Sequence, residues 1–228
     1  MVDAIDAGGR SLYRAGGVSA LGLGFAYLVT IPLYAHVGGP PTGGEAWLKY
    51  LSGKTTEWWA ILGLSVLTDF LFVPVALSLY LALKGVSRNA MMVATAFVTL
   101  FIVLDLSVTW VNYASLISLS HSYAAATNDA QRAAFVAAAN YPSAVLASRV
   151  ETVYAIVVLS FAILMISLVM LRGVFNRATA YLGLATGILG IASITGWSVT
   201  IIMNAVLATV WILFVGYRLY RLGLLIPT

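Results

Sequence analysis

The stretch EWWAILGLSVLTDFLFVPVALSLYLALK, residues 57–84, decides the fold class of this chain. Between the glutamate that opens it and the lysine that closes it, the only acidic or basic residue is Asp69. A helix needs about 20 consecutive, predominantly apolar residues to cross the hydrocarbon core of a bilayer. The stretch therefore predicts a transmembrane helix. Pro74 should kink it, because proline removes one backbone hydrogen bond from a helix.

The composition of the whole chain is typical of a membrane protein. Of its 228 residues, 61% are hydrophobic and 9% are charged, whereas a soluble domain carries about 25% charged residues. The mean hydropathy is +0.98. Cysteine is absent, which excludes disulfides, thiolate metal sites and thiol redox chemistry. We predict an all-α, polytopic transmembrane helix bundle that forms a single membrane domain over residues 1–228.

Six apolar segments are expected to span the bilayer. They cover about residues 15–37, 57–84, 88–120, 145–171, 178–195 and 198–217. Pro40 and Pro41 end the first span, and a polar loop is expected before the second. An extracytoplasmic loop, residues 121–143, is expected to hold a short surface helix over residues 127–140, which is too polar to span.

Basic residues between the spans predict the orientation, since cytoplasmic loops carry an excess of Lys and Arg. With six spans, one face of the membrane receives Arg10, Arg14, Lys84, Arg88, Arg172, Arg177, Arg218 and Arg221. The other face receives Lys49, Lys54, Arg132 and Arg149. Eight basic residues against four predict cytoplasmic N and C termini in a multi-pass protein of the cell inner (cytoplasmic) membrane. Basic pairs between apolar runs also argue against a nucleic-acid partner.

Small residues mark two predicted helix contacts. Gly16, Ala20 and Gly24 repeat at four-residue spacing in the first span, and Gly183 and Gly187 do so in the fifth. Such faces let helix backbones approach closely in lipid, where no hydrophobic effect drives helices together. We therefore expect close helix packing at both places.

Aromatic residues gather near the predicted ends of the spans. Trp47, Trp58, Trp110 and Tyr113 fall at the outer level, and Tyr217 falls at the inner level. Tryptophan and tyrosine concentrate at membrane–water interfaces. These residues are therefore predicted to anchor the bundle at the bilayer surface, not to hold a cofactor.

Four ionisable residues fall within the predicted spans: Asp69, Asp105, Arg149 and Glu151. A charged side chain at mid-membrane costs about 2.5 to 3.5 kcal/mol on insertion scales. Such groups face the interior of a bundle, pair with an opposite charge, or take up a proton. The rise along a helix puts Asp69 and Asp105 at comparable depth near the middle of the bilayer. Intramembrane charge at this depth is the main functional signal in the sequence.

A polar stripe is predicted on the third span, where Asp105, Thr109 and Asn112 stand at i, i+4 and i+7. We expect a polar cavity that opens outward between the second, third, fourth and sixth spans, with Arg149 neutralising Glu151 or Asp105. The candidate ligand-binding or proton-coupling residues are Asp69, Asp105, Thr109, Asn112, Arg149, Glu151, Tyr154 and Asn204. A structural alternative stays open, because buried polar side chains can simply join helices by hydrogen bonds.

No motif predicts catalysis, a metal site or a cofactor. His36 and His121 flank the outward loops without the ligand spacing of a metal site. No Ser-His-Asp set stands in the sequence context of an activated nucleophile. We therefore predict no catalytic residue, no metal and no cofactor.

Several motifs together resemble a known family. They are Arg14-Ala15-Gly16-Gly17, the Asp69 helix that ends in Ala76-Leu77-Ser78-Leu79-Tyr80, the Asp105 helix with Asn112, and residues 175–190 with Tyr181-Leu182-Gly183. From about residue 14 to residue 196 the chain resembles a bacterial multi-pass membrane family that is catalogued only as a domain of unknown function (DUF4386-like). The resemblance implies a six-helix bundle and brings no activity or catalytic residues with it.

Three functions stay open from the sequence. The leading hypothesis is binding or transport of a small or lipophilic solute in the polar cavity of a protein surrounded by membrane lipids. The second is an accessory or scaffold subunit of a larger membrane complex, or a homo-oligomer, with the glycine faces and the helix of residues 127–140 as contact surfaces. The third is an intramembrane lipid-modifying enzyme, which the missing nucleophile and metal sets disfavour.

Overall fold

The computed structural model describes residues 9–225, and over this range the chain is all-helical. Six helical stretches within it are long and apolar enough to cross a membrane. They are Arg10–Val37 (α1), Thr55–Leu83 (α3), Arg88–Ala124, Arg149–Met170, Arg177–Thr195 and Ser198–Leu225 (α10). The predicted all-α bundle with six spans is thus confirmed. Residues 1–8 and 226–228 of the predicted domain lie outside the described range.

Three of the six stretches contain an irregular turn. The third divides into α4 (Arg88–Leu104), η2 (Asp105–Thr109) and α5 (Trp110–Ala124). The fourth divides into α7 (Arg149–Thr152), η3 (Val153–Val157) and α8 (Val158–Met170). The fifth is α9 (Arg177–Ala192) followed by η4 (Ser193–Thr195). Both η2 and η3 are π-helical turns and η4 is a 3₁₀ turn, so the backbone departs from α geometry in the middle of two spans.

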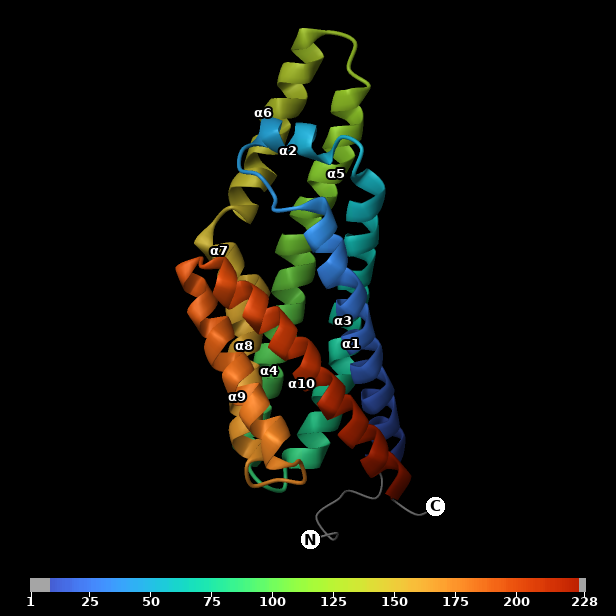
Figure 1. Ribbon diagram of the computed structural model, residues 1–228, viewed down its shortest axis with the longest axis vertical. Coiled ribbons are helices and arrows are strands. Elements are labelled where there is room, and N and C mark those ends of the chain that lie inside the picture. The colour runs from blue at the N-terminus through green and yellow to red at the C-terminus, as the bar shows by residue number, and fades with distance from the viewer. Residues whose placement is uncertain (1–8, 226–228) are drawn as a thin grey trace.

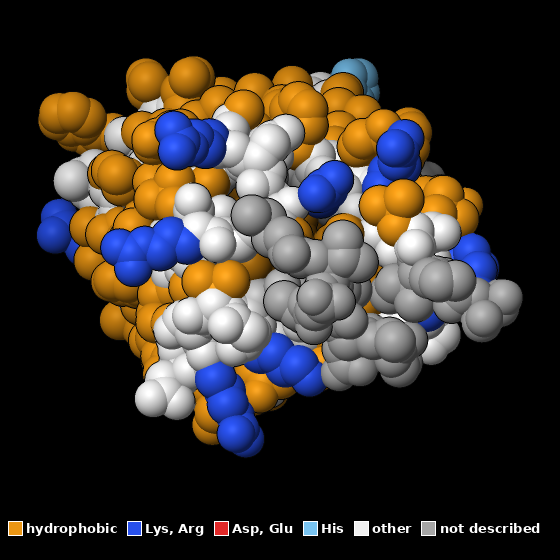
Figure 2. Space-filling view, turned by 90° about the horizontal axis from the view of Figure 1, so that it is seen from below, with side chains coloured by type: hydrophobic (Ala, Val, Ile, Leu, Met, Phe, Trp, Pro, Cys, Tyr) orange, Lys and Arg blue, Asp and Glu red, His pale blue; other side chains and the backbone are white. Residues whose placement is uncertain are grey.

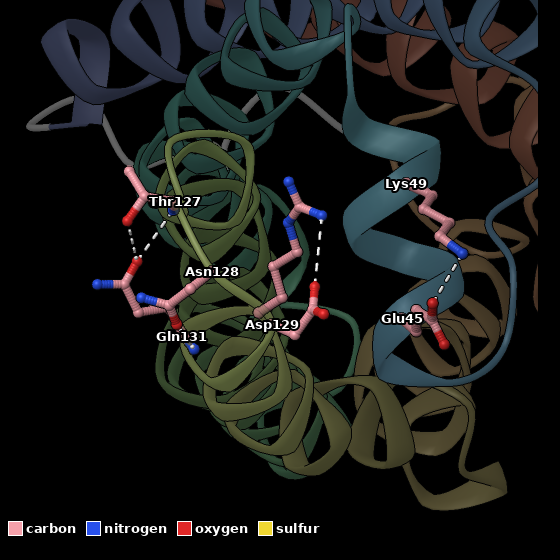
Figure 3. A network of polar contacts seen from close by, with 7 residues as sticks. Glu45, Lys49, Thr127, Asn128, Asp129 and Gln131 are labelled. Atoms are coloured by element: carbon pink, nitrogen blue, oxygen red, sulfur yellow. Dashed lines mark hydrogen bonds and ion pairs between the residues drawn. The ribbon is translucent and has the colours of Figure 1, made fainter.

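The last part of the third span, α5, forms a hairpin with α6 (Asp129–Leu146) that rises past the ends of the other long helices (Figure 1). The N terminus of α6 is capped by Asn128, whose Oδ1 accepts a hydrogen bond from the backbone N–H of Gln131 at 2.9 Å. The Gln131 side chain in turn accepts from the backbone N–H of Thr127 at 3.0 Å (Figure 3). The predicted surface helix of residues 127–140 is therefore present, and it continues six residues further, to Leu146.

The fourth span begins later than predicted. Val145 and Leu146 still belong to α6, and the chain turns at Ser148. The Ser148 hydroxyl accepts a hydrogen bond from the backbone N–H of Glu151 at 3.2 Å. Such a serine cap satisfies one of the free N–H groups at a helix start, and it sets the first residue of α7 at Arg149.

A short helix, α2 (Gly44–Leu51), replaces the polar loop that the sequence predicts after the first span. It forms because Trp47, Leu48 and Leu51 are buried along one side of it, in an apolar cluster shared with α5 and α6. The solvent-facing side holds an ion pair between Glu45 and Lys49 at 2.7 Å (Figure 3). The hydrogen bond that Lys49 donates to the Glu45 carboxylate raises the pKa of the Lys49 ammonium above its ordinary value.

Because α2 folds over the bundle, two predicted interfacial anchors are buried instead. Trp47 and Trp58 are 2% and 0% exposed. Their rings meet edge to face, with centroids 5.6 Å apart, and Trp58 also stacks on Tyr113 at 5.1 Å. Such ring pairs add stability beyond the area they bury. The end of the bundle that α2 covers therefore has an aromatic core of its own.

The caps of α2 come from α6. Gly43, at the N-cap of α2, has no side chain to offer. Its N–H donates to Ser143 Oγ at 2.8 Å, and the N–H of Gly44 donates to Asn140 Oδ1 at 3.2 Å. A Cβ added at Gly44 would lie 2.8 Å from the backbone of Ala139, so glycine permits the close approach that these hydrogen bonds need.

We expect the double variant Asn140→Ala/Ser143→Ala to release α2 from α6. Each lost hydrogen bond contributes about 1 kcal/mol, so hydrogen exchange at the amides of residues 43–51 should accelerate roughly 10- to 30-fold. Ser122→Ala is the matched control, because Ser122 bonds only to a carbonyl of its own helix. Unchanged exchange in the double variant would mean that the apolar face alone holds α2.

Small residues bring the spanning helices together. A Cβ added at Gly16 of α1 would lie 2.9 Å from the carbonyl oxygen of Pro74 in α3. One added at Gly187 of α9 would lie 3.0 Å from the Cα of Leu164 in α8. Real Cβ atoms do not approach backbone this closely without a shift. The close packing predicted for both glycine faces is confirmed.

The end of the bundle where α1 begins and α10 ends is basic. Figure 1 places these two helix ends on the same side of the molecule. The view of that end in Figure 2 shows Lys and Arg side chains around it, and no Asp or Glu is visible on its described part. Arg14 donates from Nε to the carbonyl of Gly223, and Arg218 donates to that of Val174 at 2.7 and 3.0 Å. These basic residues therefore also tie neighbouring segments together.

Candidate functional site

A cavity of about 270 Å³ lies inside the bundle around Asp69 and Asp105. Its walls come from α1, α3, the third span, the fourth span and α10. The polar side chains on its wall are Tyr27, Thr30, Tyr34, Ser65, Thr68, Asp69, Asp105, Thr109, Trp110, Tyr113, Glu151, Ser160 and Asn204. The four spans expected to enclose a polar cavity all line it, and α1 is an additional wall.

Both π turns lie on the wall of this cavity. In η2 the backbone N–H of Trp110 bonds to the carbonyl of Asp105, five residues earlier. In η3 the backbone N–H of Val158 bonds to the carbonyl of Val153 in the same way. A π turn adds one residue to a helical turn and recurs at functional sites. In η2 it brings the Trp110 side chain over Asp105.

Trp110 joins the two buried aspartates. Its indole Nε1–H lies 3.0 Å from Asp69 Oδ2 and 3.1 Å from Asp105 Oδ2, so one donor is shared between carboxyl groups of two spans. Asp69 is 2% exposed and Asp105 is 4% exposed. Such burial without a donor would be costly. The shared N–H is thus the contact that lets both acids lie at the centre of the bundle.

Several polar atoms on the wall have no hydrogen-bond partner among residues 9–225. They are Asp105 Oδ1, Thr109 Oγ1 and Thr30 Oγ1, all buried. The Thr109 hydroxyl lies beside the carboxyl groups of both Asp105 and Glu151, so rotation of this hydroxyl brings a donor to either acid. Buried polar atoms in native proteins nearly always have a partner. Among the described residues, the hydrogen bonds of these atoms are therefore incomplete.

Glu151 is the third acid of the cavity, and its predicted counter-charge lies elsewhere. Arg149 is exposed and is absent from the described wall. In the part of the chain that the structure describes, the ion pairs are Glu45–Lys49 and Asp129–Arg132. The predicted neutralisation of Glu151 or Asp105 by Arg149 is wrong, because Arg149 is the first residue of α7 and Glu151 lies two residues later, on another side of the turn.

Asn112 also leaves the predicted stripe. Asp105 and Thr109 line the cavity, whereas Asn112 lines a separate, open groove between α5 and α6 with Tyr141 and Pro142. Its Nδ2 donates to the carbonyl of Val108 at 2.7 Å. An i+7 residue shares a face only in an uninterrupted α-helix. The extra residue in η2 breaks that register, so Trp110 and Tyr113 occupy the wall instead.

Two further predicted residues have separate positions. Asn204 of α10 lines the cavity and donates from Nδ2 to the carbonyl of Thr186 at 2.8 Å, which ties α10 to α9. Tyr154 lies in a neighbouring pocket, about 360 Å³ in volume, which shares Glu151 with the main cavity. The structure therefore brings together five of the eight predicted residues: Asp69, Asp105, Thr109, Glu151 and Asn204.

Sequence reasoning missed the contribution of α1. Tyr27, Thr30 and Tyr34 lie on the cavity wall. They stand at i, i+3 and i+7, the spacing of one helix face. The spacing of these three residues already predicts a polar helix face in the sequence. Because none of them is charged, the prediction from ionisable residues did not include them.

Comparisons with known proteins assign no family to the chain that contains this cavity. No family model, no curated protein and no solved structure matches the chain. The resemblance to a multi-pass family of unknown function stays a prediction. The described site is a small cavity lined by acidic and aromatic side chains.

Proposed function

We propose that this chain binds a small or lipophilic solute in the cavity around Asp69, Asp105 and Glu151, and passes it across the membrane. The observation that carries the proposal is a cavity whose described wall holds three carboxyl groups and no Lys, Arg or His. Carboxyl groups within membrane spans are costly and rare, and they often mark the pathway of a solute or a proton. The two bridged aspartates are the candidates for coupling solute occupancy to protonation.

We also propose that the protein lies in the cell inner membrane with both termini in the cytoplasm. Six candidate spans support a multi-pass membrane protein. The basic end seen in Figure 2 supports the orientation, because positively charged segments are retained on the cytoplasmic side. In this orientation the α5–α6 hairpin faces away from the cytoplasm.

Cysteine accessibility tests the proposal directly, because the natural chain has no cysteine. Ala208 of α10 lines the cavity, so Ala208→Cys places one thiol there. Ala134→Cys, on the exposed surface of α6, is the reactive control. Ala94→Cys, at a position that is 0% exposed in the core, is the sealed control. The reagents are small methanethiosulfonates, which form a mixed disulfide with a thiolate.

We expect neutral methyl methanethiosulfonate to modify Ala208→Cys within about tenfold of the rate at Ala134→Cys, while Ala94→Cys stays unmodified, since access and ionisation set thiol reactivity. Membrane-impermeant reagents added to intact cells or to inverted vesicles then report sidedness. Access to residue 208 from both sides supports passage, and access from one side supports binding alone. A thiol at residue 208 as unreactive as the one at residue 94 would sink the proposal. In intact cells, the thiol at residue 134 should react from outside.

Neither alternative hypothesis, the accessory subunit or the lipid-modifying enzyme, is favoured by a contact in the described residues. The enzyme would use the carboxyl groups of the cavity as acid and base, whereas a subunit that acts only through its surface would leave them without a role.

A further inference from the structure

We propose that the solute of this cavity is a small organic cation, that is, a protonated amine or a quaternary ammonium compound. The inference rests on the proposed function and deepens it by naming the chemical class of the ligand. It is carried by three features of the wall: its charge, its aromatic rings and the single donor that its two aspartates share.

The charge of the wall is one-sided. Carboxyl groups reach the cavity from three spans, at Asp69, Asp105 and Glu151. Lys, Arg and His are absent from its described lining, and Arg149 is exposed outside it. A carboxyl group that ionises in a medium of low dielectric attracts a cation strongly and makes entry of an anion costly. A cationic solute would supply the counter-charge that the protein itself does not place there.

Aromatic rings surround these acids. Tyr27, Tyr34, Trp110 and Tyr113 come from α1 and α5. Tyr113 stacks on Trp58 at 5.1 Å and packs at a tilt on Trp110 at 5.5 Å, so its ring is held in place before any ligand arrives. Electron-rich ring faces attract ammonium groups, and a set of several rings is a common recognition site for quaternary ammonium compounds.

The two aspartates share a single donor. Trp110 Nε1 donates to Oδ2 of both Asp69 and Asp105, and both residues line the cavity. One indole N–H cannot fully satisfy two carboxyl groups, each of which has several acceptor sites. An ammonium group bound in the cavity would add charge-assisted hydrogen bonds to this pair.

The size and lining of the cavity favour an organic cation over a metal ion. Its volume of about 270 Å³ is just below the range of roughly 300 to 1,000 Å³ typical of drug-sized ligands. Within residues 9–225 no three Asp, Glu or His side chains gather closely enough to hold a metal ion. A chamber lined by rings and separated carboxyl groups suits a small molecule with an apolar surface and one positive charge.

Charge selectivity at the Ala208→Cys thiol tests the inference. Three probes differ in charge: cationic 2-(trimethylammonium)ethyl methanethiosulfonate, anionic 2-sulfonatoethyl methanethiosulfonate, and the neutral methyl reagent. The cation-to-anion rate ratio at residue 208 is divided by the same ratio at Ala134→Cys, which removes the intrinsic reactivities of the probes. We expect a normalised ratio of about tenfold or more, because a cleft lined by one sign of charge raises the local concentration of counter-ions.

The ratio is then measured with Asp69→Asn/Asp105→Asn and, separately, with Glu151→Gln. These changes keep the side-chain shape and an acceptor oxygen for Trp110 Nε1 while they remove charge. The ratio should fall about fivefold or more in the aspartate variant. A normalised ratio near one, a preference for the anion, or a cation preference that all three substitutions leave intact would overturn the inference. If the neutral reagent still reacts at an unchanged rate, such a result contradicts only the cation preference and not the proposed binding cavity. If none of the three probes reacts at residue 208, the proposed function itself is contradicted.

Discussion

Gly17→Ala is expected to destabilise the bundle by about 3 kcal/mol, near the upper end of what overpacking costs. Gly17 lies where α1 crosses α10, and an added Cβ would meet the backbone N of Tyr220 at 2.5 Å and its Cα at 2.7 Å. Backbone atoms cannot move aside as the end of a flexible side chain can. The two helices would therefore have to separate, and α1 and α10 share one of the most extensive contacts in the fold. Unfolding by SDS titration in mixed micelles measures the loss.

Gly22→Ala is the matched control on the same helix. There the added Cβ would come no closer than 3.6 Å, to a methyl group of Leu71, which is ordinary van der Waals contact. Gly22 also has no positive φ to preserve. Replacing it should leave stability unchanged or raise it slightly, since alanine favours a helix more than glycine does. If the two variants lose the same stability, the effect comes from helix propensity and the close crossing of α1 and α10 has no special role.

The architecture followed from the sequence because hydrocarbon imposes a length and a composition on each span. Local sequence is enough to predict a span from the stretch around Asp69. It is also enough to predict close packing from the glycine faces of the first and fifth spans. By contrast, the sequence predicts a loop where α2 lies. The helix forms because Trp47 is buried against α6, which is distant in the sequence. Its caps likewise come from Asn140 and Ser143, about a hundred residues further along the chain. Local patterns do not contain such long-range contacts.

The candidate site was predicted in part for a similar reason. Asp69 and Asp105 were recognisable because carboxyl groups within a span are costly and rare. Their bridge through Trp110 was not recognisable, because i+5 falls off the face of Asp105 in an α-helix and meets it only after the π turn. The same turn removed Asn112 from the site. Because of the one extra residue in this turn, the Trp110 indole lines the cavity in place of the predicted Asn112 amide.

Arg149 shows the limit of placing charges by sequence proximity. Its guanidinium was expected to neutralise Glu151, but helix residues two apart do not face one another. Arg149 is exposed and Glu151 lines the cavity. The consequence is functional: the cavity keeps its acidic character, on which the inferred preference for an organic cation depends.

Trp110→Phe is expected to cost about 3 kcal/mol in the free energy of unfolding, because it removes the single N–H shared by two buried carboxyl groups and keeps most of the ring. Leaving a buried charged or polar group without its partner costs more than the hydrogen bond itself contributes. Trp59→Phe is the control. Trp59 is 47% exposed on α3, so the loss of its indole N–H should change stability by less than about 0.5 kcal/mol.

A double-mutant cycle separates the hydrogen bonds from the packing of the ring. In the Asp69→Asn/Asp105→Asn background the acceptors are uncharged, and the same Trp110→Phe change should then cost about 1 kcal/mol, since a neutral hydrogen bond contributes less than one to a charged group. The difference of about 2 kcal/mol would be the coupling between the indole and the acidic pair. Equal losses in both backgrounds would mean that Trp110 acts only by filling space. In that case the aspartates would be held in the membrane by some other partner, and the shared donor would no longer explain how the cavity keeps two acids at its centre.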